Sequence, residues 1–236
     1  MIEFDIKGCT GQITFARPAE GNAFTDAMAL QFLGALNQAA GKADLLILTG
    51  DGADFTVGRD RNEPKTGSPF DTFSKVSAVN QAMAAFPGII VAAIQGRAFG
   101  LGVGLTMRSD IAIASADARF KLDEVAHGIP PLFIMEAIVD HLVPKRALDI
   151  VLSGREFGAE EALNMGLLSR VVPAKSFKSA VEAFVSELAG RDQSVVLACK
   201  RYIRKVAALP REARSAFALV EQAQFAPGKI PRQSEQ

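Results

Sequence analysis

The sequence predicts an α/β fold followed by a helical C-terminal region, and three observations lead to this prediction. Short, nearly continuous apolar runs occur at Leu45–Leu48, Ile89–Ile94 and Ile111–Ala114. Such runs are typical of strands that helices cover on both faces of a sheet. Longer stretches with helical character separate these runs. After Phe120 the strand-like runs almost vanish and helical stretches dominate.

The N-terminal segment predicts two strands and then a helix. Residues Ile2–Ile6 and Gln12–Ala16 alternate between polar and apolar residues, and the turn Gly8–Gly11 joins them. Thr25 is a candidate N-cap for a helix that runs to about Ala40. Further helices are expected from about Phe70 to Phe86 and over residues 144–152, 158–165, 176–189, 193–207 and 211–224. We divide the chain into an α/β core, residues 1–170, and a helical region, residues 171–236.

Composition narrows the class of protein. The chain has 236 residues, with 26 Lys and Arg against 26 Asp and Glu, so it lacks the basic excess of proteins that bind nucleic acid or anionic membranes. Cys9 and Cys199 form neither a metal-ligand spacing nor a disulfide framework, which fits a reducing compartment. The longest aliphatic run, Ile89–Ile94, is far shorter than the ~20 residues of a membrane span. We expect a cytoplasmic protein with no leader, no metal and no membrane partner.

A glycine-rich turn is the most informative segment. A buried strand leads into Gly96, and Gly100, Gly102 and Gly104 follow at the start of a short helix. Glycines allow a ligand to approach the backbone, and a helix N-terminus offers free N–H groups to a developing negative charge. Leu105 breaks the spacing of the dinucleotide-binding fingerprint. On spacing alone, the glycines could equally serve close packing of strand and helix.

Two further segments complete the candidate site. The Leu45–Leu48 strand also leads into a glycine-containing loop, residues 49–63. Two such turns could place two backbone N–H groups on one carbonyl oxygen, which is the geometry of an oxyanion hole. Glu124 follows a third strand-like run. Its position alone favours an ordinary solvated or paired side chain over a catalytic one.

Together these segments resemble the crotonase (enoyl-CoA hydratase/isomerase) superfamily, over nearly the whole chain. The motifs that carry the resemblance are Arg17-Pro18 with Asn22-Ala23-Phe24, LLILTGDGADFTVGRD, AAIQGRAFGLGVGLTMRSDIAIA, FKLDEVAHGIPP, and Leu163–Leu167 with Val171–Pro173. The resemblance implies the ClpP/crotonase spiral of ββα units with a C-terminal helical region. It also implies a homotrimer or hexamer assembled through that region, which we expect to be shortened here.

The resemblance also implies roles for individual residues. The backbone N–H groups of Arg59 and Leu101 would form the oxyanion hole for an acyl-CoA thioester. The expected substrate-binding residues are Thr56, Val57, Phe99, Gly100 and Gly102. Arg59 and Leu101 depart from the family pattern, which has small residues at these positions. Coenzyme A enters as part of the substrate, and no other cofactor is implied.

The acid–base residues decide the expected reaction. Family hydratases carry two glutamates, whereas the matching positions here hold Gly104 and Glu124. A single carboxylate can move a proton between carbon atoms near the thioester while the hole stabilises the enolate. We therefore expect an enoyl-CoA double-bond isomerase with Glu124 as its one acid–base residue. The alternatives are a hydratase, dehydratase or decarboxylase acting on a particular acyl-CoA, and a binding or scaffold protein with reduced activity.

Overall fold

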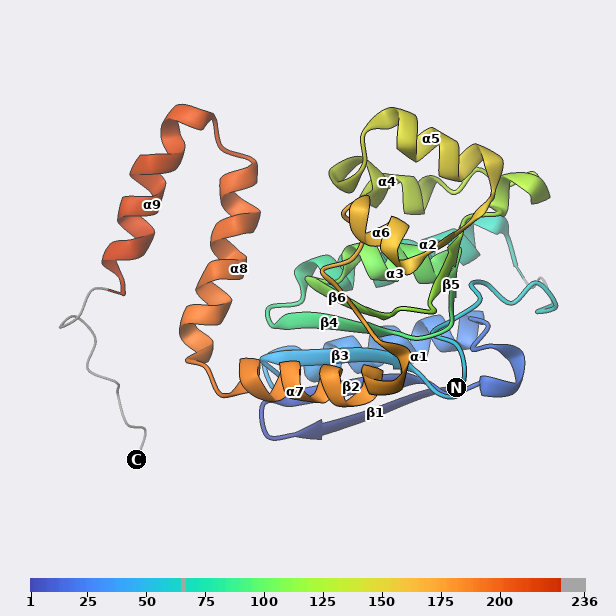
Figure 1. Ribbon diagram of the computed structural model, residues 1–236, viewed down its shortest axis with the longest axis horizontal. Helices are drawn as coiled ribbons and strands as arrows, with labels where there is room; N and C mark the ends of the chain where they lie inside the picture. Colours follow the sequence, from blue (N-terminus) through green and yellow to red (C-terminus); the bar gives the residue numbers. More distant parts are fainter. Residues whose placement is uncertain (65–66, 226–236) are drawn as a thin grey trace. The chain divides into compact units, whose positions relative to one another are not determined.

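The structure is a computed structural model that describes residues 1–64 and 67–225 (Figure 1). Contacts divide the chain into two compact units, Met1–Glu187 and Leu188–Gln236. The first unit holds both sheets and the helices that cover them. Among the described residues, no helix is long and apolar enough to cross a bilayer. Residues 226–236 of the expected C-terminal region lie outside the described residues.

The larger sheet has the strand order β1-β2-β3-β4-β6-β9. Its strands are β1 (Ile2–Lys7), β2 (Thr10–Phe15), β3 (Leu45–Gly50), β4 (Ile89–Ile94), β6 (Ile111–Ser115) and β9 (Arg170–Val172). The first pair is antiparallel and the other pairs are parallel. Every residue of β4 is buried, as its uninterrupted apolar sequence predicts.

The smaller sheet carries the elements next to the candidate site. It has the order β5-β7-β8, with β5 (Arg97–Phe99), β7 (Arg119–Lys121) and β8 (Glu156–Gly158). The expectation that strands almost vanish after Phe120 is wrong, because β8 and β9 both follow it. Each of these strands has three residues, which is too short to show a sequence period.

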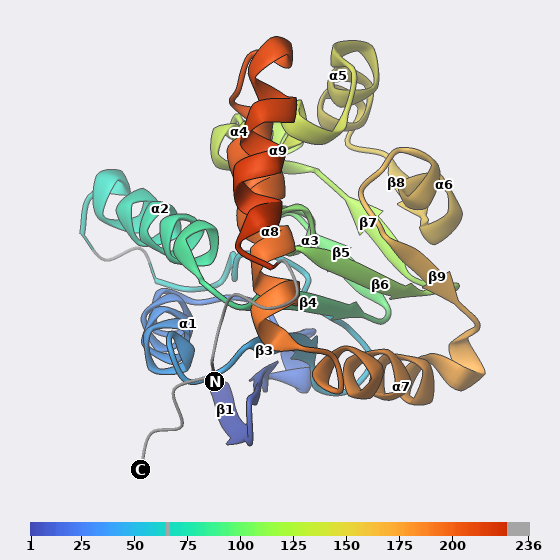
Figure 2. The ribbon, with the colours of Figure 1, turned by 90° about the vertical axis from the view of Figure 1, so that its left-hand side faces the viewer.

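Helices cover the first unit on several sides (Figures 1 and 2). The helix α1 packs on β1 and β2, α2 packs on α1, and α3 packs between β5 and α4. The helices of this unit are α1 (Asp26–Ala39), α2 (Pro69–Ala85), α3 (Leu101–Arg108), α4 (Leu132–His141), α5 (Pro144–Ser153), α6 (Ala159–Asn164) and α7 (Phe177–Ala189), with 3-10 turns η1 (Pro18–Glu20), η2 (Glu124–His127) and η3 (Ala174–Ser176). Thr25 caps α1 as predicted, because its Oγ1 accepts the N–H of Met28 at 3.1 Å.

Strand β9 and most of α7 belong to the first unit. The boundary between the two units, after Glu187, therefore falls later in the chain than the boundary predicted from the sequence, after residue 170. The Arg170 guanidinium lies 4.4 Å from the centre of the Phe184 ring and thereby ties β9 to α7. The second unit consists of α8 (Gln193–Ala207), η4 (Arg211–Ala213) and α9 (Arg214–Ala223). Stacked rings of Tyr202 and Phe217, 5.4 Å apart, join α8 to α9.

Candidate active site

The loop after β3 is held in place by a buried aromatic cluster. Phe55 is fully buried, and its ring centre lies 5.3 Å from that of Phe15 on β2. Phe24 and Phe32 pack edge-on against Phe15. Burial of one such ring stabilises a fold by about 1.5–3 kcal/mol. The cluster therefore fixes the middle of the loop against β2 and α1.

Asn22 fixes the same loop by hydrogen bonds. Its side-chain amide donates to the carbonyl oxygens of Asp51 and Asp54, at 2.9 and 2.7 Å. The backbone carbonyl of Asn22 accepts a hydrogen bond from the Thr56 hydroxyl at 2.7 Å. Asn22 is fully buried and has a φ of +57°, a backbone conformation that asparagine tolerates better than most residues. The early motif that contains Asn22 thus serves to shape the loop.

The backbone of Arg59 is turned outward by its neighbours. Phe24 donates its N–H to Gly58 at 2.8 Å and accepts the N–H of Asp60 at 3.0 Å. In such a parallel bridge, the residue between the two bonded neighbours directs its own N–H to the opposite side. Within residues 1–64 and 67–225, no hydrogen bond uses the Arg59 N–H. It is available to a ligand.

The glycine-rich turn presents a second N–H group. Gly100 has a φ of +50° and donates to the Lys121 carbonyl at 2.8 Å, which fixes the turn between β5 and α3. Leu101 is the first residue of α3, where N–H groups have no partner inside the helix. Across the described part of the chain, the Leu101 N–H has no hydrogen-bond acceptor either. The positive end of the helix dipole strengthens it as a donor.

The two turns touch each other at their glycines. A Cβ atom built on Gly58 would lie 2.9 Å from the Phe99 carbonyl oxygen and 3.6 Å from the Cα of Gly100. A side chain at Gly58 would therefore push the two turns apart. Arg59 and Leu101 directly follow the two glycines in contact, which supports the prediction that their N–H groups serve one oxygen atom.

Glu124 reaches the same place from the first residue of η2. Its Oε1 would lie 2.6 Å from a Cβ built on Gly100. Its Oε2 is buried and has no hydrogen-bond partner among the described residues. Burial raises the pKa of the Glu124 carboxyl, and the nearby charge of Asp123 raises it further. A buried carboxylate with an unused oxygen and a raised pKa has the properties of a proton acceptor.

The guanidinium of Arg59 points into a charged cluster. Its Nη2 lies 2.6 Å from Asp26 at the start of α1 and 3.0 Å from Glu63. The Glu63 carboxylate also accepts the backbone N–H of Asp26 at 2.8 Å, and Lys75 of α2 pairs with Asp26. The Arg59 side chain is therefore engaged by carboxylates, while its backbone faces the turn.

Two of the other predicted binding residues, Thr56 and Gly102, lie at the junction of the two turns. Thr56 is fully buried and pairs with β5 through its N–H and carbonyl, at 3.0 and 2.9 Å. A Cβ on Gly102 would lie 3.0 Å from both the carbonyl oxygen and the Cγ2 of Thr56. Thr56 and Gly102 thus join the loop to α3. The side chain of Val57 lies close to Gly21, where a built Cβ would be 2.9 Å away.

Comparison with known proteins identifies the family. The family model described as "Enoyl-CoA hydratase/isomerase" matches residues 5–226. A Rhodobacter capsulatus protein named "Probable enoyl-CoA hydratase" is 30% identical over 208 residues, which is 85% of this chain and 79% of that protein. The chain belongs to the enoyl-CoA hydratase/isomerase family.

Solved structures show the same fold. The crystal structure of enoyl-CoA hydratase from Mycobacterium smegmatis has a TM-score of 0.87 and 25% identity, covering 96% of this chain and 91% of that chain. A Thermobifida fusca structure in complex with acetoacetyl-CoA has a TM-score of 0.86 and 22% identity, covering 95% and 94%. The prediction of a crotonase fold is therefore confirmed.

Relative to family hydratases, the environment of Gly104 is the main departure. Gly104 is buried on α3, and a Cβ built there would lie 3.5 Å from Cγ1 of Ile134 on α4. An apolar side chain thus faces the position where the resemblance implies a second acid. Helix α3 itself, LGVGLTMR, contains no Asp or Glu.

Sequence reasoning missed the charged residues that surround the candidate site. Asp26 and Glu63 contact the Arg59 side chain, and Lys75 pairs with Asp26. Arg61 contacts Asp123 and His127. Only the i, i+4 spacing of Arg59 and Glu63 could have indicated one of these pairs. The others join residues far apart in the chain.

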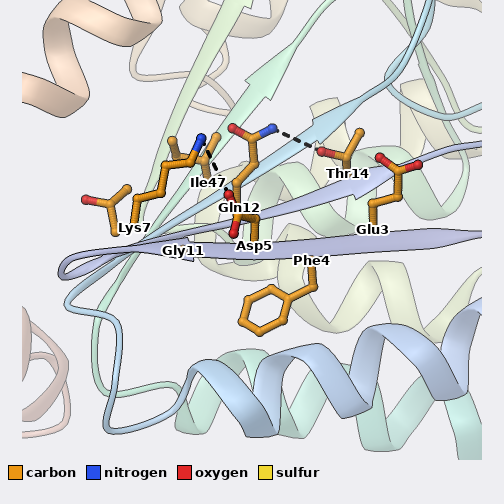
Figure 3. A pocket seen from close by; sticks show the side chains of 9 residues that line it. Glu3, Phe4, Asp5, Lys7, Gly11, Gln12, Thr14 and Ile47 are labelled. Carbon is orange, nitrogen blue, oxygen red and sulfur yellow. Dashed lines mark hydrogen bonds and ion pairs between the residues drawn. The ribbon is translucent and has the colours of Figure 1, made fainter.

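A shallow pocket lies elsewhere in the first unit, on the exposed face of β1, β2 and β3 (Figure 3). Lys7 pairs with Asp5 at 3.5 Å, and the Gln12 amide donates to Thr14 at 3.1 Å. None of the predicted site residues lines this pocket, so we assign it no part in the reaction.

Proposed function

We propose that this chain is an acyl-CoA enzyme that moves a double bond, with Glu124 as its single acid–base residue. The observation that carries the proposal is the half-buried Glu124 carboxylate against Gly100, with its buried Oε2 unpartnered among the described residues. Family membership supports a thioester of coenzyme A as the substrate. The environment of Gly104 favours proton transfer over the addition of water, because no second acid faces Glu124 from α3.

The mechanism needs only groups of this chain. The thioester oxygen accepts hydrogen bonds from the N–H groups of Arg59 and Leu101. Glu124 removes a proton from the α-carbon, which lies between the thioester and a β,γ double bond, and negative charge collects on the thioester oxygen as an enolate. The protonated Glu124 then returns the proton to the γ-carbon, so that the double bond moves to the α,β position. No atom is gained or lost, and the carboxylate is regenerated.

Hydration is the second candidate, since the Rhodobacter capsulatus relative is named a hydratase. It would require Glu124 alone to activate the water and protonate the carbon. A catalytically reduced binding protein is the third candidate, favoured by the departures at Leu101 and Gly104. The homotrimer or hexamer stays a prediction, which light scattering of the purified chain would test.

A screen of acyl-CoA thioesters by liquid chromatography and mass spectrometry separates these functions. Isomerisation leaves the mass unchanged and shifts the retention time. Hydration adds one water, and decarboxylation removes carbon dioxide. Tight binding of thioesters with no product would support the binding protein and contradict an enzyme.

A further inference from the structure

Arg61 bridges the two parts of the candidate site. Its Nη2 donates to Oδ1 of Asp123 at 2.5 Å, and its Nη1 lies 2.5 Å from Nε2 of His127. Arginine has no acceptor, so Nε2 of His127 must accept this hydrogen bond. Asp123 directly precedes Glu124, and His127 ends the same 3-10 turn. One guanidinium therefore holds both ends of the turn that carries the carboxylate.

The other end of this bridge is fixed to the oxyanion loop. Arg61 follows Arg59 by two residues, and two hydrogen bonds hold Asp60 between them. The Asp60 carboxylate accepts from the Arg17 guanidinium at 3.0 Å, and the Asp60 N–H donates to Phe24 at 3.0 Å. With the Arg59 side chain also engaged, Arg61 extends from a loop that is fixed on both sides. A short, restrained path thus connects the Arg59 N–H to Glu124.

The 3-10 turn η2 has further contacts, which hold the segment that Arg61 binds. A Cβ built on Gly154, which ends α5, would lie 3.6 Å from the Cα of Asp123. Lys121 of β7 adds a second cation, 3.4 Å from Asp123. Although burial opposes it, these two cations lower the pKa of Asp123, which keeps it ionised and paired.

We propose that Arg61 is a positioning residue that sets the Glu124 carboxylate relative to the oxyanion loop, by binding Asp123 and His127 on either side of it. This inference rests on the proposed function, in which Glu124 is the base. Arg61 also has a second effect, because its positive charge opposes the rise in the pKa of Glu124. Among the described residues, the charges of Asp123 and Arg61 act on Glu124, and Lys121 and His127 contact Asp123.

An alternative use of Arg61 is contact with a phosphate of coenzyme A, since 56% of its side chain is exposed. The two uses differ in what they change. A phosphate contact acts on binding of the whole thioester and alters KM. A positioning residue acts on the geometry of proton transfer and alters kcat, and here it also alters the pH at which Glu124 ionises.

The test compares Arg61→Gln with Arg61→Lys and with the control Arg155→Gln. Arg155 also pairs with two carboxylates, Asp149 at 2.9 Å and Glu161 at 2.5 Å, but contacts neither Asp123 nor His127. We expect Arg61→Gln to lower kcat by about tenfold to a hundredfold, with KM changed by less than about threefold. The acid limb of the pH profile should move to higher pH. Arg61→Lys should recover part of the activity, and Arg155→Gln should keep it.

A turnover-independent measurement separates this inference from the proposed function. The Glu124 carboxyl can be titrated by ¹³C NMR in protein with labelled glutamate, using Glu124→Gln to assign the signal. Arg61→Gln should raise the titration midpoint of Glu124 even if no thioester is turned over. A raised KM with unchanged kcat and midpoint would overturn the inference in favour of a phosphate contact. Unchanged kinetics and an unchanged midpoint would also overturn the inference, and the contacts of Arg61 would then be an ordinary surface ion pair.

Discussion

Glu124 and Gly100 are in direct contact, because a Cβ atom on Gly100 would lie only 2.6 Å from Oε1 of the carboxylate. The carboxylate thus occupies the space that any larger residue at position 100 would need. This contact places the candidate base beside the residue that precedes the Leu101 N–H. The Glu124 carboxylate and the Leu101 N–H therefore lie in one place, although β6 and β7 separate them along the chain.

Gly100→Ala should therefore displace the carboxylate as well as strain the turn. The backbone conformation of Gly100, with a φ of +50° and a ψ of −112°, costs an alanine about 1–3 kcal/mol. Displacement of the Glu124 carboxylate should lower the kcat of the variant by about a hundredfold. Gly41→Ala is the matched control. Gly41 has a φ of +76°, but nothing lies within 4 Å of a built Cβ. Steady-state kinetics should show the large loss for Gly100→Ala only, while thermal unfolding shows a loss of stability for both.

The Arg59 side chain offers a second prediction. Arg59→Ala still supplies the backbone N–H, so we expect less than about a hundredfold loss of kcat/KM, which corresponds to ~2.7 kcal/mol. It should lower thermal stability, because Asp26 and Glu63 lose the cation between them. Burial tends to raise the pKa of Asp26, but Lys75 and Arg59 together hold it low.

Glu63→Gln tests the same cluster without changing residue 59. It weakens the pair with Arg59 and should reproduce part of the stability loss while kcat/KM stays near the parent value. A loss of activity well beyond a hundredfold for Arg59→Ala alone would show that the guanidinium binds substrate. The bound cluster would then have to open in the complex.

Gly102 and Gly104 of α3 give a matched pair for a third prediction. A Cβ on Gly104 would be in ordinary contact with Ile134 at 3.5 Å, whereas one on Gly102 would be crowded at 3.0 Å by Thr56. Alanine stabilises a helix interior by about 0.5–1 kcal/mol relative to glycine. Gly104→Ala should therefore raise the melting temperature by about 1–4 °C. Gly102→Ala should lower it, and equal effects would contradict this account of the helix.

How far the sequence predicts this fold depends on the length of each element. The apolar runs predicted β3, β4 and β6, since each has enough residues to show burial on both faces. Strand β5 has three residues and no pattern of its own. It forms because Thr56 and Lys121 supply hydrogen-bond partners from other segments. Tertiary pairing, and not local preference, defines such strands.

The candidate site divides in the same way. The glycine turns and Glu124 could be selected from the sequence, because glycine spacing and motif order are local signals. The bonds of Arg61 to Asp123 and His127 span 62 and 66 residues, and no periodicity relates them. Whether a charged residue is solvated or clamped depends on which surfaces the fold brings together. Sequence alone therefore favoured an ordinary role for Glu124, and burial against Gly100 changes that balance.

The final prediction concerns Glu124 itself. Glu124→Gln keeps the size of the side chain and its hydrogen-bonding capacity but cannot accept a proton. We expect turnover to fall by about a hundredfold to ten-thousandfold, with thioester binding nearly unchanged. Solvent deuterium should enter the substrate beside the thioester with the parent chain and not with the variant. Normal turnover of the variant would transfer the role of base to Asp123 or to water.

Although Glu124→Gln should lower turnover, it should raise the stability of the folded chain. Because burial raises the pKa of Glu124 in the folded chain, the stability that its protonated form contributes is lost as the pH rises through that pKa. The folded chain is thus less stable when Glu124 is ionised, although the reaction needs the ionised form. At pH 8 Glu124→Gln should unfold at a higher temperature than the parent, and the difference should shrink on acidification. Thermal unfolding measured from pH 5 to pH 8 checks this. A variant less stable than the parent at pH 8 would mean that the ionised carboxylate has a partner in solution, and Glu124 would then be a structural residue held by that partner rather than a base awaiting substrate.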